Sequence, residues 1–480
     1  MLPIEDYCRL LPELVASGFG ILIMLAEPFV ARERKGWLAR VALVGAIASL
    51  ASILVAARFP GTAFYNLIRL DDFSIFLHVI VFGIAALVVL AAHHYLEREG
   101  LPQGEFYALL LFATTGMGIM AGANELVTAF VGLEISSISS YILAGWRRDA
   151  LKSNESAMKY FLLGSFATAF FLYGVAMVYG AMGTTQLDKL QVAISAVHGG
   201  GTLLILGLGM MFVGLGFKIA TAPFHVWTPD VYEGAPTPVT ALFASAPKAA
   251  ALAMMLRIFY TAFGSASDTW FWAIWISAVL TMFVGNIAAL VQTNVKRMLA
   301  YSSIAHAGYL MVAFAARSEI GVAAILFYLV AYALMKLGAF TALAHLGGRG
   351  EQRLEIEDYA GMATKRPITA ACLSLFLLSL LGLPPTAGFL GKLYVFNAAL
   401  NANLVWLAVL LAINSVIAAY YYLRVIMAMY FREAQSDWTP EPMPRAIALV
   451  LLITAAGTIY LGIFPGTLMN FAAQGALSLR

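Results

Sequence analysis

Apolar stretches of about 20 residues recur along the whole chain and are separated by short polar segments. A helix of this length crosses the hydrocarbon core of a bilayer, so the pattern predicts an all-α polytopic membrane protein. We expect about fourteen transmembrane helices. Their predicted ranges are 9–31, 37–57, 72–95, 104–122, 124–145, 153–181, 198–230, 237–263, 268–292, 296–315, 318–345, 366–400, 403–432 and 444–470.

Prolines interrupt three of these predicted helices. The seventh contains Pro223, the eighth contains Pro247 directly before Lys248, and the twelfth contains Pro384 and Pro385. Proline removes a backbone donor, so we expect local unwinding at each of these positions. Irregular backbone persists inside a membrane only where protein buries it or water reaches it. Broken helices at matching places in two halves are typical of transporters with inverted repeats.

The seventh and twelfth predicted helices are each the fourth member of a block of five. The third helix of each block also carries a Met-Lys pair, at Met158-Lys159 and at Met335-Lys336. We therefore expect two five-helix repeats, the second inverted relative to the first. The predicted divisions are three N-terminal helices in 1–100, a first repeat in 101–264, a second repeat in 265–433 and a C-terminal helix in 434–480.

The composition agrees with a membrane protein and excludes several other classes. Of the 480 residues, 61% are hydrophobic and 11% are charged, whereas a soluble domain carries about 25% charged residues. No basic block with interleaved aromatic residues indicates a nucleic-acid partner. Cys8 and Cys372 lie far apart, without the spacing of a metal site or a disulfide framework.

Basic residues gather in alternate loops, which predicts the orientation of the chain. They follow or flank the first, third, fifth, ninth, eleventh and thirteenth predicted helices: Arg32, Arg34, Lys35, Arg40, Arg98, Arg147, Arg148, Lys152, Lys296, Arg297, Arg349, Arg353, Lys365, Arg366, Arg432 and Arg445. The loops on the other side carry few basic residues. We therefore expect the basic loops in the cytoplasm and both termini on the opposite side.

Six charged side chains lie well inside the predicted helices: Glu134, Lys159, Lys218, Lys248, Lys336 and Lys392. An ionisable group at the bilayer centre costs about 2.5–3.5 kcal/mol on insertion scales, so each one needs a partner, water or a function. One acid together with several lysines indicates a path for protons or cations. The alternative is a static buried ion pair that only fixes the packing of helices.

Three groups each have a structural explanation. His306, inside the tenth predicted helix, either packs through hydrogen bonds or relays protons. Lys159 is close enough to a helix end for its ammonium to reach the cytoplasmic face. Arg257 is near the end of its helix, and we expect it to extend to the membrane surface in the same way.

A pair of buried charges suffices to control a proton. A lysine moved out of water loses affinity for its proton, and a nearby carboxylate restores that affinity. At about 4 Å and an effective dielectric constant near 20, one unit charge changes the energy of another by about 4 kcal/mol. Closing or opening such a pair would therefore load or unload the lysine.

Two segments resemble the signature of antiporter-like proton-channel subunits of respiratory complex I, the proton-translocating NADH:quinone oxidoreductase. The first begins at Lys218 and contains Pro-Asp-Val-Tyr-Glu-Gly-Ala-Pro-Thr-Pro at 229–238, and the second is Lys-Arg-Met-Leu-Ala-Tyr-Ser-Ser-Ile-Ala-His at 296–306. Among these subunits the chain is most similar to bacterial subunit N and to mitochondrial and plastid subunit 2. Subunit M has glutamate where this chain has Lys392, and subunit L continues into a lateral helix.

The resemblance implies roles for individual residues. Glu134 would pair with Lys218, Lys248 would be the central relay, and Lys392 would be the group nearest the exit. His306 and Lys336 would lie along the central polar axis, and Lys159 is a further candidate for the relay. His225 and Asp230 belong to the loop motif after the first break.

The resemblance also implies a cellular setting. The chain would be a translocase subunit in the bacterial inner (plasma) membrane, with both termini periplasmic and with subunits M, K and J as neighbours. NADH, FMN, iron–sulfur clusters and quinone would act in partner subunits, and no cofactor is expected in this chain.

Two other functions share the core signature. One is a stand-alone monovalent cation/proton antiporter, although sodium transport favours more carboxylates, because hard cations prefer oxygen ligands. The other is a structural spacer of the membrane arm, in which the buried lysines would be dispensable.

Overall fold

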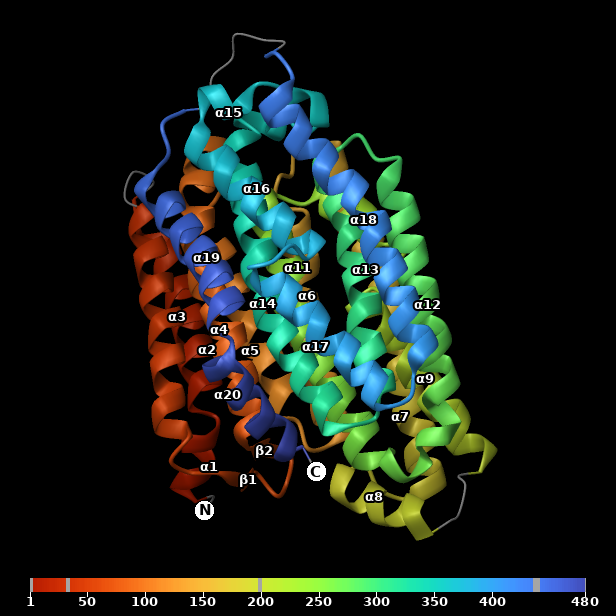
Figure 1. The fold of residues 1–480 in the computed structure, drawn as a ribbon. Coiled ribbons are helices and arrows are strands. Elements are labelled where there is room, and N and C mark those ends of the chain that lie inside the picture. Colours follow the sequence, from red (N-terminus) through yellow and green to blue (C-terminus); the bar gives the residue numbers. More distant parts are fainter. Residues whose placement is uncertain (1–2, 32–34, 197–200, 435–440, 480) are drawn as a thin grey trace.

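The computed structural model describes residues 3–31, 35–196, 201–434 and 441–479 and confirms an all-α polytopic membrane protein (Figure 1). Within these ranges, 13 helices are long and apolar enough to cross a membrane. The twelfth predicted helix is broken, and its first half is a shorter apolar helix at Pro367–Leu381. Arg32, Arg34 and Arg480, which belong to the predicted orientation pattern or mark the C-terminus, lie outside the described residues.

The helices of the first part are α1 (Ile4–Arg9), α2 (Leu11–Ala26), α3 (Gly36–Ala56), α4 (Asp72–Glu99), α5 (Gly104–Gly122), α6 (Leu126–Ala144), α7 (Leu151–Met182), α8 (Leu187–Ala196), α9 (Thr202–Ile219), α10 (Thr228–Gly234) and α11 (Thr237–Leu256). They continue with α12 (Ser267–Leu290), α13 (Val295–Ala315), α14 (Glu319–Leu346), α15 (Met362–Lys365), α16 (Pro367–Leu381), α17 (Ala387–Asn401), α18 (Val405–Phe431), α19 (Arg445–Ile463) and α20 (Gly466–Leu477). Short 3-10 segments occupy Glu27–Phe29, Gly264–Ala266, Arg349–Glu351 and Ile356–Tyr359, and a π-helical segment occupies Arg257–Ala262. Strands β1 (Gly61–Ala63) and β2 (Ile68–Leu70) form one antiparallel hairpin.

Two of the three predicted interruptions are present. The seventh predicted helix ends as α9 at Ile219 and resumes as the short α10, and the twelfth is divided into α16 and α17. The helix after α18 also differs from its predicted range, because α19 ends at Ile463 and α20 is a separate helix.

The predicted unwinding at Pro247 is wrong. α11 runs without a break through Pro247 and Lys248. A proline leaves the carbonyl four residues before it without its helical donor. Here that carbonyl belongs to Phe243, and it accepts a hydrogen bond of 3.1 Å from the hydroxyl of Tyr232. A side chain of α10 therefore supplies the donor that the proline removes, and the helix continues.

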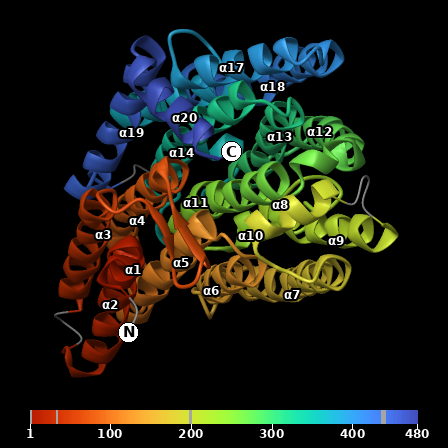
Figure 2. The same ribbon diagram turned by 90° about the horizontal axis from the view of Figure 1, so that it is seen from below.

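α11, α13 and α14 form the core of the bundle (Figures 1 and 2). In the most apolar part of each helix, 100%, 94% and 83% of the residues are buried, respectively. α4, α19 and α20 pack against α14, while α6 and α9 contact α11. The lysines of these three helices, Lys248, Lys296 and Lys336, are thus buried within the protein. Figure 1 shows both chain ends at one end of the bundle and α15 at the other.

Polar side chains fix where several buried helices begin. Asp71 accepts a hydrogen bond from the backbone of Ser74 at the start of α4, and Asn294 and Ser318 cap α13 and α14 in the same way. Such caps satisfy backbone donors that have no partner within the helix. The ends of the two central helices are therefore set by local chemistry.

Arg257 does not extend to the membrane surface, so that prediction is wrong. Its side chain is 1% exposed, and its two terminal nitrogens lie 2.9 and 2.8 Å from the carboxylate oxygens of Asp71. This bidentate pair joins the end of α11 to the start of α4. Truncating one partner would leave a buried charge behind, which is costly.

Candidate functional site

Lys248 lies at the centre of α11 and is 1% exposed. Its ammonium donates to the carbonyl and hydroxyl oxygens of Ser303 on α13, at 2.6 and 2.7 Å. The hydroxyl of Tyr332 donates to the same Ser303 oxygen at 2.6 Å. The Lys248 nitrogen also lies 5.4 Å from the centre of the Tyr332 ring. The contacts of this buried cation are thus neutral oxygens and an aromatic face.

Lys336 on α14 is fully buried beside Lys248. Its ammonium donates to the carbonyl of Leu299 at 2.8 Å and to the hydroxyl of Ser302 at 2.9 Å. Its nitrogen lies 5.7 Å from the centre of the Tyr332 ring, so that one ring contacts both lysines. Adjacent residues of α13, Ser302 and Ser303, therefore each hold one lysine.

His306 lies one helical turn further along α13, in contact with two tyrosine hydroxyls. Its Nδ1 is 2.6 Å from the hydroxyl of Tyr328, and its Nε2 is 3.1 Å from that of Tyr422. The Tyr422 hydroxyl is also 2.5 Å from the hydroxyl of Ser302. The predicted central groups Lys336 and His306 are thus joined through Ser302 and Tyr422.

Lys392 lies on α17, directly after the second break. Its ammonium donates to the carbonyl of Leu381, the last residue of α16, at 2.8 Å. Its nitrogen is 4.9 Å from the ring centre of Tyr309, whose ring lies 5.2 Å from that of His306. The second break therefore places a lysine at the edge of the central network.

Lys218 lies in the last turn of α9, directly before the first break. Its ammonium donates to the hydroxyls of Ser137 and Tyr160 at 2.9 and 3.3 Å. The direct ion pair that we predicted with Glu134 is not formed among the described residues. Ser137, one turn along α6 from Glu134, takes its place. One carboxylate oxygen of Glu134 is buried without a hydrogen-bond partner in the part of the chain that is described.

Lys159 and Asp230 belong to a separate cluster at the end of α7. The Lys159 ammonium lies 2.5 Å from the carboxylate of Asp230 and 2.6 Å from that of Glu155. Arg297 binds the other oxygen of Asp230 at 2.7 Å. The Lys159 side chain is 40% exposed. The structure therefore separates Lys159 from the central lysines.

Another motif residue, His225, is partly buried, and its Nδ1 has no hydrogen-bond partner among the residues described.

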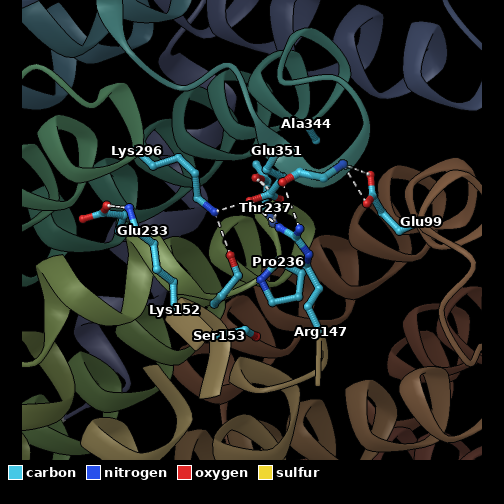
Figure 3. Close-up of polar contacts among 12 residues, drawn as sticks. Glu99, Arg147, Lys152, Ser153, Glu233, Pro236, Thr237, Lys296, Ala344 and Glu351 are labelled. Atoms are coloured by element: carbon cyan, nitrogen blue, oxygen red, sulfur yellow. Dashed lines mark hydrogen bonds and ion pairs between the residues drawn. The ribbon is translucent and has the colours of Figure 1, made fainter. Parts of the chain in front are cut away.

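A buried acid that the sequence did not single out ties the bundle together near this end (Figure 3). One carboxylate oxygen of Glu351 accepts hydrogen bonds from the hydroxyl of Tyr95 and from the backbone and hydroxyl of Thr237, at 2.8, 2.7 and 2.6 Å. The other lies 2.9 Å from the ammonium of Lys296 and 3.6 Å from Arg147. We call these five residues the Glu351 clasp. It joins α4, α11 and α13 to the loop after α6.

The clasp also corrects the placement of Lys296. We counted this residue among the loop charges, but its side chain is fully buried, and its ammonium donates to the carbonyl of Ala235 as well as to Glu351. A cavity of about 330 Å³ lies beside the clasp and is lined by Glu351, Arg147 and Glu233 among others. A polar cavity therefore adjoins the carboxylate that binds the buried Lys296.

The comparisons with known proteins agree with this geometry. Residues 123–418 match the model of the NADH:quinone oxidoreductase/Mrp antiporter transmembrane family. NADH-quinone oxidoreductase subunit N 1 of Solibacter usitatus is 46% identical over 477 residues, covering 99% of this chain and 98% of that protein. Subunit N 2 of Koribacter versatilis is 48% identical over 486 residues, covering 100% of this chain and 98% of that protein.

A solved structure shows the same fold over the whole chain. One chain of the respiratory complex I from Thermus thermophilus with bound aureothin has a TM-score of 0.82 and 36% identity, covering 96% of this chain and 99% of that one. The family model, the full-length relatives and the solved structure point to one conclusion. The chain belongs to the family of NADH-quinone oxidoreductase subunit N.

Proposed function

We propose that this chain is a membrane-arm subunit of a proton-translocating NADH:quinone oxidoreductase and conducts protons through its buried lysines and His306. Lys218 receives a proton on the side of the first break, Lys248 and Lys336 hold it at the centre, and Lys392 releases it beyond the second break. Glu134 sets the charge state of Lys218 through their proximity. The ion pair between Lys159 and Asp230 holds the segment after the first break in place, and His225 belongs to the same segment.

One observation carries this proposal: Lys248, Lys336 and Lys392 have no carboxylate partner among the described residues. Lys248, Lys336 and Lys392 are 1%, 0% and 7% exposed, and their hydrogen bonds go to hydroxyl and carbonyl oxygens. Lysines that only fix helix packing are normally paired, because desolvation of an unpaired charge costs several kcal/mol. Neutral, flexible partners instead suit groups that gain and lose a proton.

The competing functions fit this geometry less well. A sodium path needs several oxygen ligands around the ion. Among the described residues, no group of three or more His, Cys, Asp or Glu side chains could hold a metal ion. A structural spacer would not require buried cations at the centre. The family model covers both oxidoreductase subunits and antiporters, whereas the full-length relatives are subunit N proteins.

The setting within the complex follows from the same proposal. The neighbours of the chain are other membrane subunits, with M on one face and the small subunits K and J nearby. NADH, FMN, iron–sulfur clusters and quinone act in partner subunits, and this chain holds no cofactor. The end with α15 faces the bacterial cytoplasm and both termini face the periplasm, because the basic loops gather at that end.

The proposed organisation divides the chain at the positions that the sequence suggested. Residues 1–100 form an N-terminal three-helix part, residues 101–264 and 265–433 form two inverted repeats, and 434–480 form the C-terminal part. Matching contacts support the repeats: α5 packs on α6 as α12 packs on α13, and α6 contacts α7 as α13 contacts α14. Each repeat also contains one broken helix.

Substitution of Lys248 tests the proposal. Lys248→Ala removes the titrating group, while Lys248→Arg keeps a charge that resists deprotonation. We expect both variants to lose most NADH-driven proton uptake in inverted membrane vesicles, normalised to assembled complex. Lys189→Ala, at an exposed lysine of α8, is the matched control. Wild-type uptake in Lys248→Arg would exclude a relay role and leave Lys248 as a fixed electrostatic element.

A further inference from the structure

Four side chains from three helices form one continuous line of hydrogen bonds through the core. Lys336 on α14 contacts Ser302 on α13 at 2.9 Å, Ser302 contacts Tyr422 on α18 at 2.5 Å, and Tyr422 contacts His306 on α13 at 3.1 Å. All four residues are at most 1% exposed. Every link is within hydrogen-bond distance, so a proton could cross this line without an intervening water.

The chemistry of the end groups gives the line a direction. A protonated lysine has only donors, so the oxygen of Ser302 must accept from Lys336. The hydroxyl proton of Ser302 is then available to Tyr422, and that of Tyr422 is available to Nε2 of His306. In this arrangement Nδ1 carries the ring proton and donates to Tyr328 at 2.6 Å. Hydrogen bonds aligned in one direction strengthen one another in a low-dielectric interior.

We propose that the hydroxyls of Ser302 and Tyr422 are a proton wire that connects Lys336 to His306, and that Tyr422 on α18 is a catalytic residue of proton transfer. The proposal rests on the proposed function of the chain. In one transfer an N–H bond of Lys336 breaks and its proton binds Ser302, while the Ser302 proton moves to Tyr422 and the Tyr422 proton moves to Nε2 of His306. Lys336 becomes neutral and His306 becomes an imidazolium.

The neighbouring serine has a different set of contacts. Ser303 accepts from both Lys248 and Tyr332, so in this arrangement the Tyr332 hydroxyl does not receive a proton from it. Ser302 instead contacts a donor on one side and a hydroxyl that continues the line on the other. The two adjacent serines thus separate two functions: Ser303 holds Lys248, and Ser302 connects Lys336 to His306.

The test is Tyr422→Phe, which removes the hydroxyl and keeps the ring. The control is Tyr107→Phe on α5, an equally buried tyrosine whose hydroxyl has no hydrogen-bond partner among the described residues. Both variants are measured in the assembled complex in inverted vesicles, as NADH-driven proton uptake and as its solvent deuterium isotope effect. NADH oxidation by a soluble acceptor that bypasses quinone reports on the integrity of the redox part.

We expect Tyr422→Phe to slow proton uptake by about 10²-fold, the lower end of what a positioned proton-transfer group contributes, with a larger isotope effect. Tyr107→Phe should stay near wild type. Normal uptake in Tyr422→Phe, or an equal loss in both variants, would overturn the wire. If Tyr422→Phe does not assemble, Ser302→Ala decides by the same criteria, with Ser302→Thr as its hydroxyl-retaining control.

Normal uptake in Tyr422→Phe together with lost uptake in Lys248→Ala would reject only the wire. Normal uptake in Lys248→Ala would reject the proposed function.

Discussion

Replacing Glu351 by glutamine should destabilise the chain by removing the only carboxylate of the Glu351 clasp. The substitution keeps the size of the side chain but leaves Lys296 without its counter-charge. Lys296 is fully buried, and its other described contact is the carbonyl of Ala235 at 2.7 Å. Arg147, 3.6 Å from the same carboxylate, adds a second positive charge that would no longer be balanced.

Two estimates of the magnitude agree. Removing one partner of a buried pair costs about 3–5 kcal/mol. Independently, burial raises the pKa of Glu351, but Lys296, Thr237 and Arg147 more than offset this and lower it from 4.5 to about 2. At 1.36 kcal/mol for each pKa unit, that difference corresponds to about 3 kcal/mol. Because the folded-state pKa is the lower one, this contribution is complete above pH 4.5 and is lost as the pH falls from there toward 2.

The assay is the temperature at which this subunit is lost from the purified complex, measured by size-exclusion chromatography after heating. A loss of about 3 kcal/mol should lower that temperature by about 3 °C, given an unfolding entropy of about 2.1 cal/mol/K per residue over 480 residues. The double variant Glu351→Gln/Lys296→Met should recover most of the loss, since it also removes the buried ammonium that Glu351→Gln leaves without a counter-charge. Glu357→Gln, in an exposed pair with Arg432, is the control and should not shift the temperature.

Either of two results would refute this reasoning. The first is a Glu351→Gln variant that is as stable as Glu357→Gln. The second is a double variant that is less stable than Glu351→Gln alone, because it would show that Lys296 stabilises the fold without its carboxylate partner.

Three shorter predictions concern coupling, the second break and orientation. Glu134→Ala should assemble yet reduce NADH-driven proton uptake, because the field at Lys218 changes; wild-type uptake would leave the acid a purely structural role. Gly388→Ala should weaken assembly, because its new methyl group would overlap a backbone carbonyl at the second break, whereas Gly209→Ala meets no atom within 4 Å; equal assembly of the two would contradict this. A cysteine added after Arg480 should react with an impermeant thiol reagent in whole cells, and labelling only after lysis would show that the orientation is inverted.

The sequence predicted the transmembrane helices and the two breaks because both depend on short-range properties. A run of apolar residues has to span the bilayer wherever it packs, and Pro223 and Pro384 limit helical geometry through their own rings. At Pro247 the same short-range reasoning gave a wrong prediction. Its effect is cancelled by the hydroxyl of Tyr232, a contact across helices that no local pattern reveals.

The candidate site was predicted as a set of residues but not as a set of contacts. Lys159 and Lys336 share the same Met-Lys string, yet Lys159 pairs with Asp230 at a helix end and Lys336 is buried in the core. The difference is the depth and rotation of each helix, which packing decides. Ser302 and Ser303 were visible as polar positions within an apolar helix, but only the structure shows which lysine each one binds.

At both breaks, a lysine without a directly bound carboxylate lies at the C-terminal end of a half-helix. Lys218 is a residue of the last turn of α9, and the ammonium of Lys392 binds the last carbonyl of α16, so each lysine belongs to or contacts the negative end of a half-helix dipole. Such an end contributes about 0.3–1 kcal/mol, and up to about 2 kcal/mol in partly buried sites. Desolvation of a buried ion costs several kcal/mol, so the dipole offsets it only in part. A carboxylate bound to each lysine would hold the proton too tightly for transfer, whereas a helix end leaves each lysine able to release it.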